Sequence, residues 1–256
     1  MTRHTDTVDV AGVVFQLFCR FPKPGFWARR RPEFITSRPA DVVVRVEYEE
    51  DFRGRTGCAV GDTVADAADV RRRGRQLLVS TGYYRATVDV QRGRVSVRIA
   101  AGFDVSGLMR TLAALWHLDR GTLLLHAACF GPGAAATLAL GQPASAMPSS
   151  ATVGWFAVTP RAGTVDVRPT PFLHGEGPRR SSRWRATTLW LSGAGAPNRP
   201  IGAVSALRAM LPSIWQADRR RAAVERTLDL ATRVVTTLHC REVGVTGDAA
   251  EEALVG

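Results

Sequence analysis

Residues 121–130 read GTLLLHAACF, a stretch that is apolar after its first two residues except for His126. A short apolar run that follows a glycine predicts a buried strand, and this run is too short to span a bilayer. Leucines recur at helical spacing just before it, over residues 104–118, where Ser106 can cap the predicted helix. A helix that leads into a buried strand indicates an α/β arrangement.

Further strands and turns are expected after this run. The sequence predicts a turn at 131–133, a strand at 136–140, a loop of small residues at 141–151, and strands at 153–158 and 164–167. It then predicts helices at 201–211 and 218–238, an edge strand at 241–245 and a short helix at 248–254. Residues 104–256 are therefore expected to form one α/β domain.

The part of the chain ahead of that domain has a different pattern. β-branched residues are frequent there, which predicts strands at 42–48, 76–80, 84–90 and 95–99, with the last two forming a hairpin. Residues 53–75 carry glycine, aspartate and arginine with few large apolar side chains, and we expect a loop. Residues 1–103 are therefore expected to form a β-rich N-terminal domain.

The charge of the chain is strongly basic. Its 256 residues carry a net charge of +11, and Lys23 is the only lysine among 34 lysines and arginines. A positive balance favours acidic partners such as phosphate, nucleic acid or acidic protein. A GC-rich genome produces the same bias from lysine to arginine without any functional demand. In either case, no lysine is available for catalysis outside position 23.

The cysteines exclude two classes of protein. Cys19, Cys58, Cys129 and Cys240 are widely spaced and form no CxxC pair. This pattern excludes a disulfide scaffold and a structural zinc site of the usual paired spacing. The first residues also show no apolar leader segment. We therefore expect a reduced, cytoplasmic protein with no membrane span.

Two stretches together resemble a known family. The strand sequence GTLLLHAA at 121–128 and the downstream RPTPF at 168–172 are similar to the HPr serine kinase/phosphorylase-like P-loop proteins. That family shows such a strand, then a hairpin into a phosphate loop, an Asp-Asp pair and a TPF sequence. The resemblance covers most of the chain in the order of its elements, and it is specific only near these two stretches. It implies a P-loop HPr-kinase-like α/β domain.

The phosphate loop of this domain is degenerate. The pattern G-x-x-x-x-G-K-[ST] needs glycines that let backbone N–H groups surround phosphate, a lysine for the β/γ-phosphates and a hydroxyl for magnesium. Anchored on Gly141, the pattern meets Ala146, Met147 and Pro148 at its last three fixed positions. Anchored on Ser149 as the hydroxyl, it has Pro148 in the lysine position. No alignment of the pattern here retains the lysine, so the nucleotide loop is expected to be non-functional.

The acidic residues of such a site are also missing. No aspartate or glutamate occurs between Asp119 and Asp166, and Gly154-Trp155 stands where the family has its Asp-Asp pair. No carboxylate is available there to hold magnesium or accept a hydroxyl proton. We therefore predict no catalytic residue and no metal site.

Other residues are candidate contacts to a partner or ligand. His126 lies near the degenerate loop, and His174 and Glu176 share a glycine-rich stretch, where a histidine and a carboxylate can act as acid and base. Arg183 and Trp184 combine a charge for phosphate with a ring for stacking. Each candidate also has a plainer interpretation. His126 can be an ordinary strand histidine, and His174 and Glu176 can lie on an exposed loop. Arg183 and Trp184 can belong to a solvated charged surface.

The sequence thus favours a non-catalytic, pseudokinase-like binding or assembly subunit that engages a protein partner and needs no cofactor. The first alternative is an atypical ATP-dependent serine kinase of a protein or peptide, which would use ATP and magnesium. The second alternative is a nucleic-acid-binding protein, whose binding would depend steeply on salt concentration.

Overall fold

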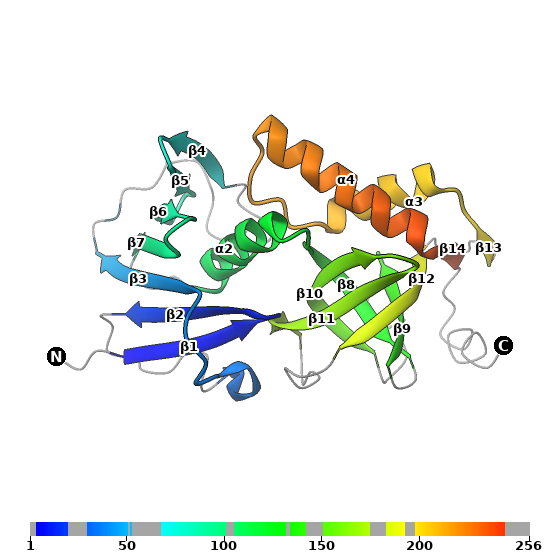
Figure 1. Cartoon of the computed structure of the whole chain (residues 1–256), viewed down its shortest axis with the longest axis horizontal. Coiled ribbons are helices and arrows are strands. Elements are labelled where there is room, and N and C mark those ends of the chain that lie inside the picture. Colours follow the sequence, from blue (N-terminus) through cyan, green and yellow to red (C-terminus); the bar gives the residue numbers. More distant parts are fainter. Residues whose placement is uncertain are drawn as a thin grey trace. The chain divides into compact units, whose positions relative to one another are not determined.

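A computed structural model of the chain describes residues 4–19, 30–50, 52, 68–100, 105–131, 134–141, 151–174, 183–192 and 198–243. The chain divides into two compact units (Figure 1). Residues 1–116 with 216–224 form the first unit, and residues 117–215 with 225–256 form the second. The expected boundary between residues 103 and 104 stays a prediction.

The first unit contains a seven-stranded sheet. Its strands are β1 (His4–Val10), β2 (Val13–Cys19), β3 (Val42–Glu49), β4 (Asp69–Arg73), β5 (Gln76–Ser80), β6 (Tyr84–Asp89) and β7 (Arg94–Ala100). Their order across the sheet is β1-β2-β3-β7-β6-β5-β4. The pairs β2–β3 and β3–β7 are parallel and the others antiparallel. A short 3-10 helix, η1 (Pro32–Phe34), lies between β2 and β3 in the chain.

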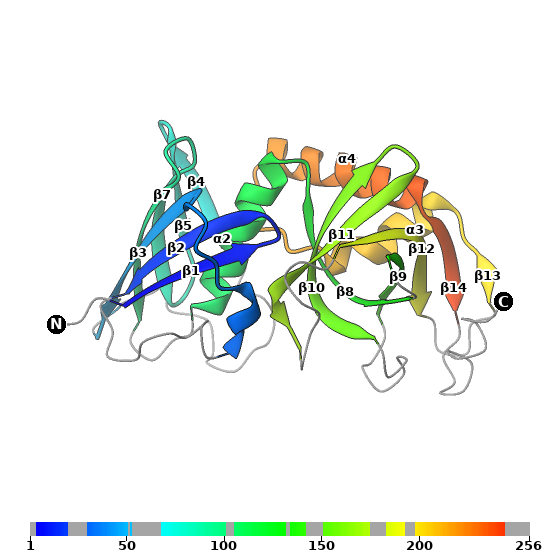
Figure 2. The same ribbon diagram turned by 60° about the horizontal axis from the view of Figure 1, so that its bottom comes forward.

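One face of this sheet forms the core of the first unit. Strand β7 alternates between buried Val95, Val97 and Ile99 and exposed polar side chains. Such alternation is typical of a sheet with one packed face and one solvated face. Helix α2 (Ser106–Asp119) lies against the packed face (Figures 1 and 2).

Helix α2 is fixed to the sheet by aromatic side chains. Trp116 meets Phe15 of β2 edge to face with ring centroids 6.0 Å apart. The hydroxyl of the buried Tyr84 donates a hydrogen bond of 2.9 Å to Thr111 Oγ1 on the helix. Because α2 covers this face, the opposite face of the sheet carries the polar side chains outward.

The second unit contains another seven-stranded sheet. Its strands are β8 (Leu123–Phe130), β9 (Ala135–Leu140), β10 (Thr152–Arg161), β11 (Thr164–Leu173), β12 (Trp184–Ser192), β13 (Arg199–Pro200) and β14 (His239–Val243). Their order is β11-β10-β8-β9-β12-β14-β13, and β11 also pairs with β12. This extra pairing joins β11, β10, β8, β9 and β12 into a closed ring of strands.

The C-terminal helices follow that ring in sequence. They are α3 (Ala203–Met210), the 3-10 turn η3 (Leu211–Ser213) and α4 (Arg221–Thr237). One face of α4 is buried through Leu230, Ala231 and Val234. The apolar spacing predicted a face that includes Leu228, and this part of the prediction is wrong, because Leu228 is 38% exposed. The pair β12–β14 is parallel, so the chain crosses back through α3 and α4 between these two strands.

The mixed α/β class predicted from the sequence is confirmed, and so are the helix at 104–118, the buried strand after it and the hairpin at 84–99. The loop predicted at 53–75 is wrong for its last part, because β4 occupies Asp69–Arg73 as a charged edge strand. Strand β12 was not predicted. The helix predicted at 248–254 lies outside the described residues.

Candidate functional site

The strands that would frame a phosphate loop are β9 and β10. Strand β9 ends at Leu140, and Gly141 follows with a φ of +73°. The other predicted loop positions, Ala146, Met147, Pro148 and Ser149, lie outside the described residues. Strand β10 begins at Thr152 and pairs antiparallel with β8. Ala151 is the described residue that leads into β10.

The acid nearest in sequence to these strands is neutralised by arginine. Asp166 on β11 is buried, and its Oδ2 atom accepts hydrogen bonds from Arg183 at 2.5 Å and Arg161 at 3.4 Å. Burial by itself would raise the pKa of the Asp166 carboxyl. The hydrogen bonds and charges of Arg183 and then Arg161 outweigh burial and lower that pKa below its ordinary value. A carboxylate held in this way is a structural anchor and a poor proton acceptor.

Two of the predicted contact residues belong to this anchor. Arg183 pairs with Asp166, and Trp184 beside it packs edge to face on Phe156 with ring centroids 6.2 Å apart. Arg183 and Trp184 thus fix the start of β12 to β11 and β10. Both have a structural role in the chain, in addition to any contact with a ligand.

The two predicted histidines come together on the outside of the ring. The Nε2 atoms of His126 on β8 and His174 after β11 lie 3.3 Å apart. The ring centroids are 5.6 Å apart, so the two nitrogens point almost directly at each other. One imidazole donates and the other accepts, which needs different tautomers in the two rings. Glu176, predicted beside His174, lies outside the described residues.

Two tryptophans extend this pair into an aromatic cluster of His126, His174, Trp155 and Trp215. Trp155 lies opposite His126 in the β8–β10 register, with ring centroids 5.0 Å apart. Trp215 meets Trp155 at a right angle with centroids 5.2 Å apart. All four rings are half-buried or exposed. Neither tryptophan was predicted as a contact residue, because four separate segments supply the cluster.

Backbone contacts hold the cluster in place. The His174 N–H donates 2.8 Å to the Val153 carbonyl, and the Trp215 N–H donates 2.9 Å to the Leu124 carbonyl. Gly154 pairs with Leu173 of β11 and has a φ of +149°, and a Cβ there would lie 2.5 Å from the Leu173 Cα. The close approach of β10 and β11 that brings His174 toward His126 therefore requires glycine.

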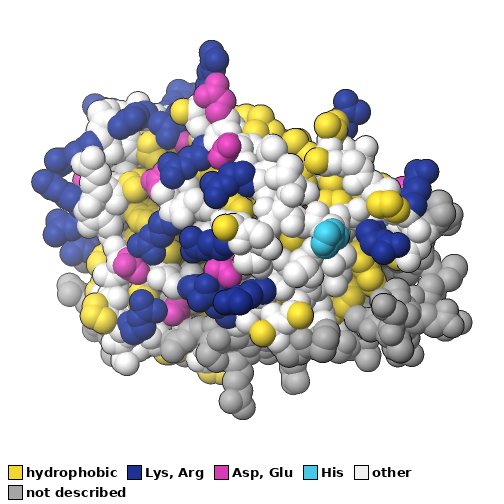
Figure 3. Space-filling model, turned by 45° about the vertical axis from the view of Figure 1, so that its right-hand side comes forward, with side chains coloured by type: hydrophobic (Ala, Val, Ile, Leu, Met, Phe, Trp, Pro, Cys, Tyr) yellow, Lys and Arg dark blue, Asp and Glu magenta, His cyan; other side chains and the backbone are white. Residues whose placement is uncertain are grey.

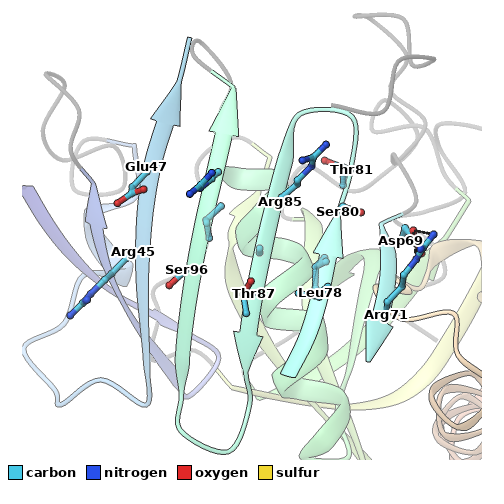
Figure 4. A pocket seen from close by; sticks show the side chains of 14 residues that line it. Arg45, Glu47, Asp69, Arg71, Leu78, Ser80, Thr81, Arg85, Thr87 and Ser96 are labelled. Atoms are coloured by element: carbon cyan, nitrogen blue, oxygen red, sulfur yellow. Dashed lines mark hydrogen bonds and ion pairs between the residues drawn. The ribbon is translucent and has the colours of Figure 1, made fainter. Parts of the chain in front are cut away.

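A second feature, which the sequence did not predict, is the open face of the first sheet. We use this name for the outward side chains of β3, β4, β5, β6 and β7 (Figure 4). They surround a hollow of about 750 Å³. The residues form two rows across the strands, one of Glu47, Arg98, Arg85, Ser80 and Asp69 and one of Arg45, Ser96, Thr87, Leu78 and Arg71.

The open face is rich in arginine. Arg98 pairs with Glu49 at 3.2 Å and Arg71 pairs with Asp69 at 3.0 Å, yet both arginine side chains stay about two-thirds exposed, at 67% and 66%. Exposed pairs of this kind contribute about 0–1 kcal/mol. Arginines and acidic side chains are also interspersed on the molecular face drawn in Figure 3.

Three further observations bear on the candidate functions. Among the described residues, no helix is both long and apolar enough to cross a membrane. No group of three or more histidine, cysteine, aspartate or glutamate side chains there is arranged to hold a metal ion. In comparisons with known proteins, the chain matches no protein-family model and no curated sequence.

Proposed function

We propose that the chain is a non-catalytic binding or assembly subunit that engages a protein partner, on a scaffold similar to the HPr-kinase-like P-loop domain. The observation that carries this proposal is the absence of acidic residues between Asp119 and Asp166. Strands β8, β9 and β10 all fall within this stretch. Phosphoryl transfer needs groups that hold magnesium and position the attacking hydroxyl.

The arrangement of the strands is compatible with such a scaffold. The two stretches that carry the family resemblance lie on β8 and β11, which flank β10 in the sheet. Asp166, the first acid after the gap, is occupied by Arg161 and Arg183. The ion pairs that join Asp166 to its neighbouring arginines thus support a structural role for this acid. The stretch between Asp119 and Asp166 supplies no carboxylate that could hold magnesium or accept the hydroxyl proton.

The aromatic cluster is the part of the second unit best suited to a partner. Partly exposed tryptophan side chains are frequent energetic anchors of protein interfaces, because they bury a large area with few rotatable bonds. Trp155 and Trp215 present such rings beside a histidine pair that can donate or accept hydrogen bonds. A protein segment that packs on the two indoles would meet both kinds of contact.

The first test is thermal unfolding with and without millimolar Mg-ATP. A ligand at about 100 times its Kd adds about 2.7 kcal/mol, which corresponds to a rise in Tm of roughly 5–10 °C for a chain of this size. We expect no rise. A clear rise would instead support the atypical ATP-dependent serine kinase, and binding of an oligonucleotide that weakens steeply with salt would support the nucleic-acid alternative.

The second test concerns the partner surface. The tagged full chain is cross-linked to proteins of its own source cell, and the captured bands are compared among Trp215→Ala, His174→Ala and His239→Ala. His239 is an exposed histidine on β14, outside the cluster. We expect the first two variants to lose a specific band and His239→Ala to keep it. Equal capture by all three would argue against the cluster as the contact surface.

A further inference from the structure

The histidine pair of the aromatic cluster has a geometry that a contact with a protein partner does not require. The Nε2 atoms of His126 and His174 lie 3.3 Å apart. Imidazole nitrogen is the commonest metal ligand in proteins. Two nitrogens that bind one tetrahedral Zn²⁺ ion, each at about 2.0–2.1 Å, lie roughly 3.3–3.4 Å from each other. The spacing of the pair is therefore that of two ligands on a single metal ion.

We propose that His126 and His174 form a two-histidine site for a divalent transition metal ion of the class of Zn²⁺, Ni²⁺ and Cu²⁺, bound through both Nε2 atoms. Imidazole suits these ions, whereas Mg²⁺ and Ca²⁺ prefer oxygen ligands. The prediction of no metal site from the sequence rested on missing carboxylates, and the histidine pair is a different set of donors. This inference goes beyond the proposed function and does not depend on it.

The strands hold the two rings near each other before any ion binds. His126 lies on β8, and the His174 N–H donates 2.8 Å to the carbonyl of Val153 on β10, the strand between β8 and β11. Trp155 packs on the His126 ring with centroids 5.0 Å apart. Ligands that are already positioned lose less conformational entropy when they bind. The fold thus lowers the cost of forming the site.

The pair is also accessible from solvent. His174 is exposed and His126 is half-buried. An ion can therefore reach both nitrogens and keep water at its remaining coordination positions, or accept a side chain of a partner there. Open positions of this kind distinguish the site from closed structural zinc sites, which use four protein ligands.

An ion at this site replaces the hydrogen bond between the two rings. In that bond one Nε2 carries a proton and the other accepts it. The donor ring releases this proton to water and takes up a proton from water at Nδ1, so it changes tautomer and stays neutral. Because the ion lies beside the line that joins the nitrogens, each lone pair must also turn by about 35°. The broad χ2 torsion of histidine permits such a turn.

The test uses the purified full chain, freed of metal with EDTA and dialysed, at physiological ionic strength and about pH 7.5, where an ordinary imidazole is neutral. The probe is Ni²⁺, a paramagnetic ion that quenches tryptophan fluorescence at short range and does not oxidise thiols. Trp155 lies beside His126, so binding at the pair is measured as a partial loss of fluorescence. Excess Zn²⁺, which does not quench, is then added as a competitor.

Three single variants are compared in the same titration. His126→Gln and His174→Gln each remove one of the two nitrogens and keep a polar side chain. His239→Gln is the matched control, since His239 is an exposed histidine on β14, outside the cluster. Tm values measured without metal verify that the variants are folded. Because the His174 side chain is exposed, His174→Gln keeps the test decisive even if His126→Gln unfolds the chain.

We expect Ni²⁺ to quench the wild-type chain to a plateau, excess Zn²⁺ to restore the fluorescence, and Mg²⁺ to have no effect. His126→Gln and His174→Gln should each raise the Kd for Ni²⁺ about tenfold or more, and His239→Gln less than about twofold. Quenching that is unchanged in His174→Gln, an equal loss in His239→Gln, or no saturable binding by the wild-type chain would overturn the proposal. None of these outcomes bears on the Mg-ATP or cross-linking tests, which use neither Ni²⁺ nor Zn²⁺.

Discussion

His126 and His174 are 48 positions apart in the sequence, yet their Nε2 atoms face each other at 3.3 Å. The order β11-β10-β8 explains this contact, because His174 follows β11 and reaches across β10 to β8. The pair therefore reports directly on whether the three strands are assembled in this order. It also links the end of β11 to the aromatic cluster around Trp155.

A double-mutant cycle measures this contact. We expect His174→Ala to lower the free energy of unfolding by about 0.5 kcal/mol, because an exposed hydrogen bond contributes little. His126→Ala should cost about 1–2 kcal/mol, since the half-buried ring also packs on Trp155. The double variant should show a coupling energy of about 0.5 kcal/mol in urea denaturation. His239→Ala combined with His126→Ala is the control, and equal coupling in both cycles would disprove the pairing.

The close approach of β10 and β11 at Gly154 gives a second prediction. Gly154→Ala places a Cβ 2.5 Å from the Leu173 Cα and 2.9 Å from the Phe172 carbonyl oxygen, at a φ that disfavours alanine. We expect a loss of about 2 kcal/mol or more in the free energy of unfolding, because backbone atoms on both sides must move. Urea denaturation monitored by circular dichroism measures the loss.

The matched control for this variant lies at the turn between the same two strands. Gly163 has a φ of +68°, and nothing lies within 4 Å of an added Cβ. Gly163→Ala should therefore lower the free energy of unfolding only through the left-handed backbone at residue 163, by about 1–2 kcal/mol. If Gly154→Ala costs no more than Gly163→Ala, the tight contact between β10 and Leu173 is wrong.

The arginine-bound carboxyl of Asp166 predicts a pH dependence. Its pKa is lowered in the folded chain by Arg183 and Arg161, against the opposing effect of burial. A lowered pKa stabilises the fold above the unfolded value, which is about 3.9 for aspartate, and this stability is lost as pH falls through the lower folded value. Asp166→Asn should therefore cost about 1–2 kcal/mol near pH 7, and the difference from wild type should shrink below about pH 4.

The exposed Asp229 on α4 supplies the comparison for that experiment. Asp229→Asn should change the free energy of unfolding by only a few tenths of a kcal/mol at every pH measured. Chemical denaturation across the pH range measures both variants. A cost of Asp166→Asn that persists unchanged in acid would mean that packing, and not the ion pair, explains it.

Regular local patterns made part of the fold predictable. The alternation in Arg94–Ala100 indicated a half-buried strand, and the leucines of Ser106–Asp119 indicated a helix. Strand β12 has no such regularity, because a shift of register between Ala186 and Thr188 breaks its alternation. Strand β4 reads as a loop for a related reason, since its Arg71–Arg73 run lies on a sheet edge where few side chains are buried.

The candidate site was predictable only in its parts. The sequence singled out His126 and His174 separately, but the order of the strands that brings them together is not a local property. Trp155 and Trp215 were not predicted as contact residues, because a single tryptophan in a sequence is as typical of a buried core as of a contact surface. The open face needed the registers of five strands, since Arg85 and Arg98 become neighbours only when β6 and β7 pair.

Cys19, which is partly buried, and the buried Cys129 give the last prediction. Burial raises the pKa of the Cys129 thiol to about 12, and burial followed by the charge of Asp6 raises that of Cys19 to about 11. The thiolate is the reactive form, so at pH 8 only about 10⁻³ of Cys19 and about 10⁻⁴ of Cys129 can react. Timed alkylation with iodoacetamide, mapped by mass spectrometry, should label Cys19 before Cys129 and both far more slowly than in urea. Labelling of Cys129 first would mean that β8 opens more readily than the end of β2, because only exposure could then overcome the lower thiolate content of Cys129.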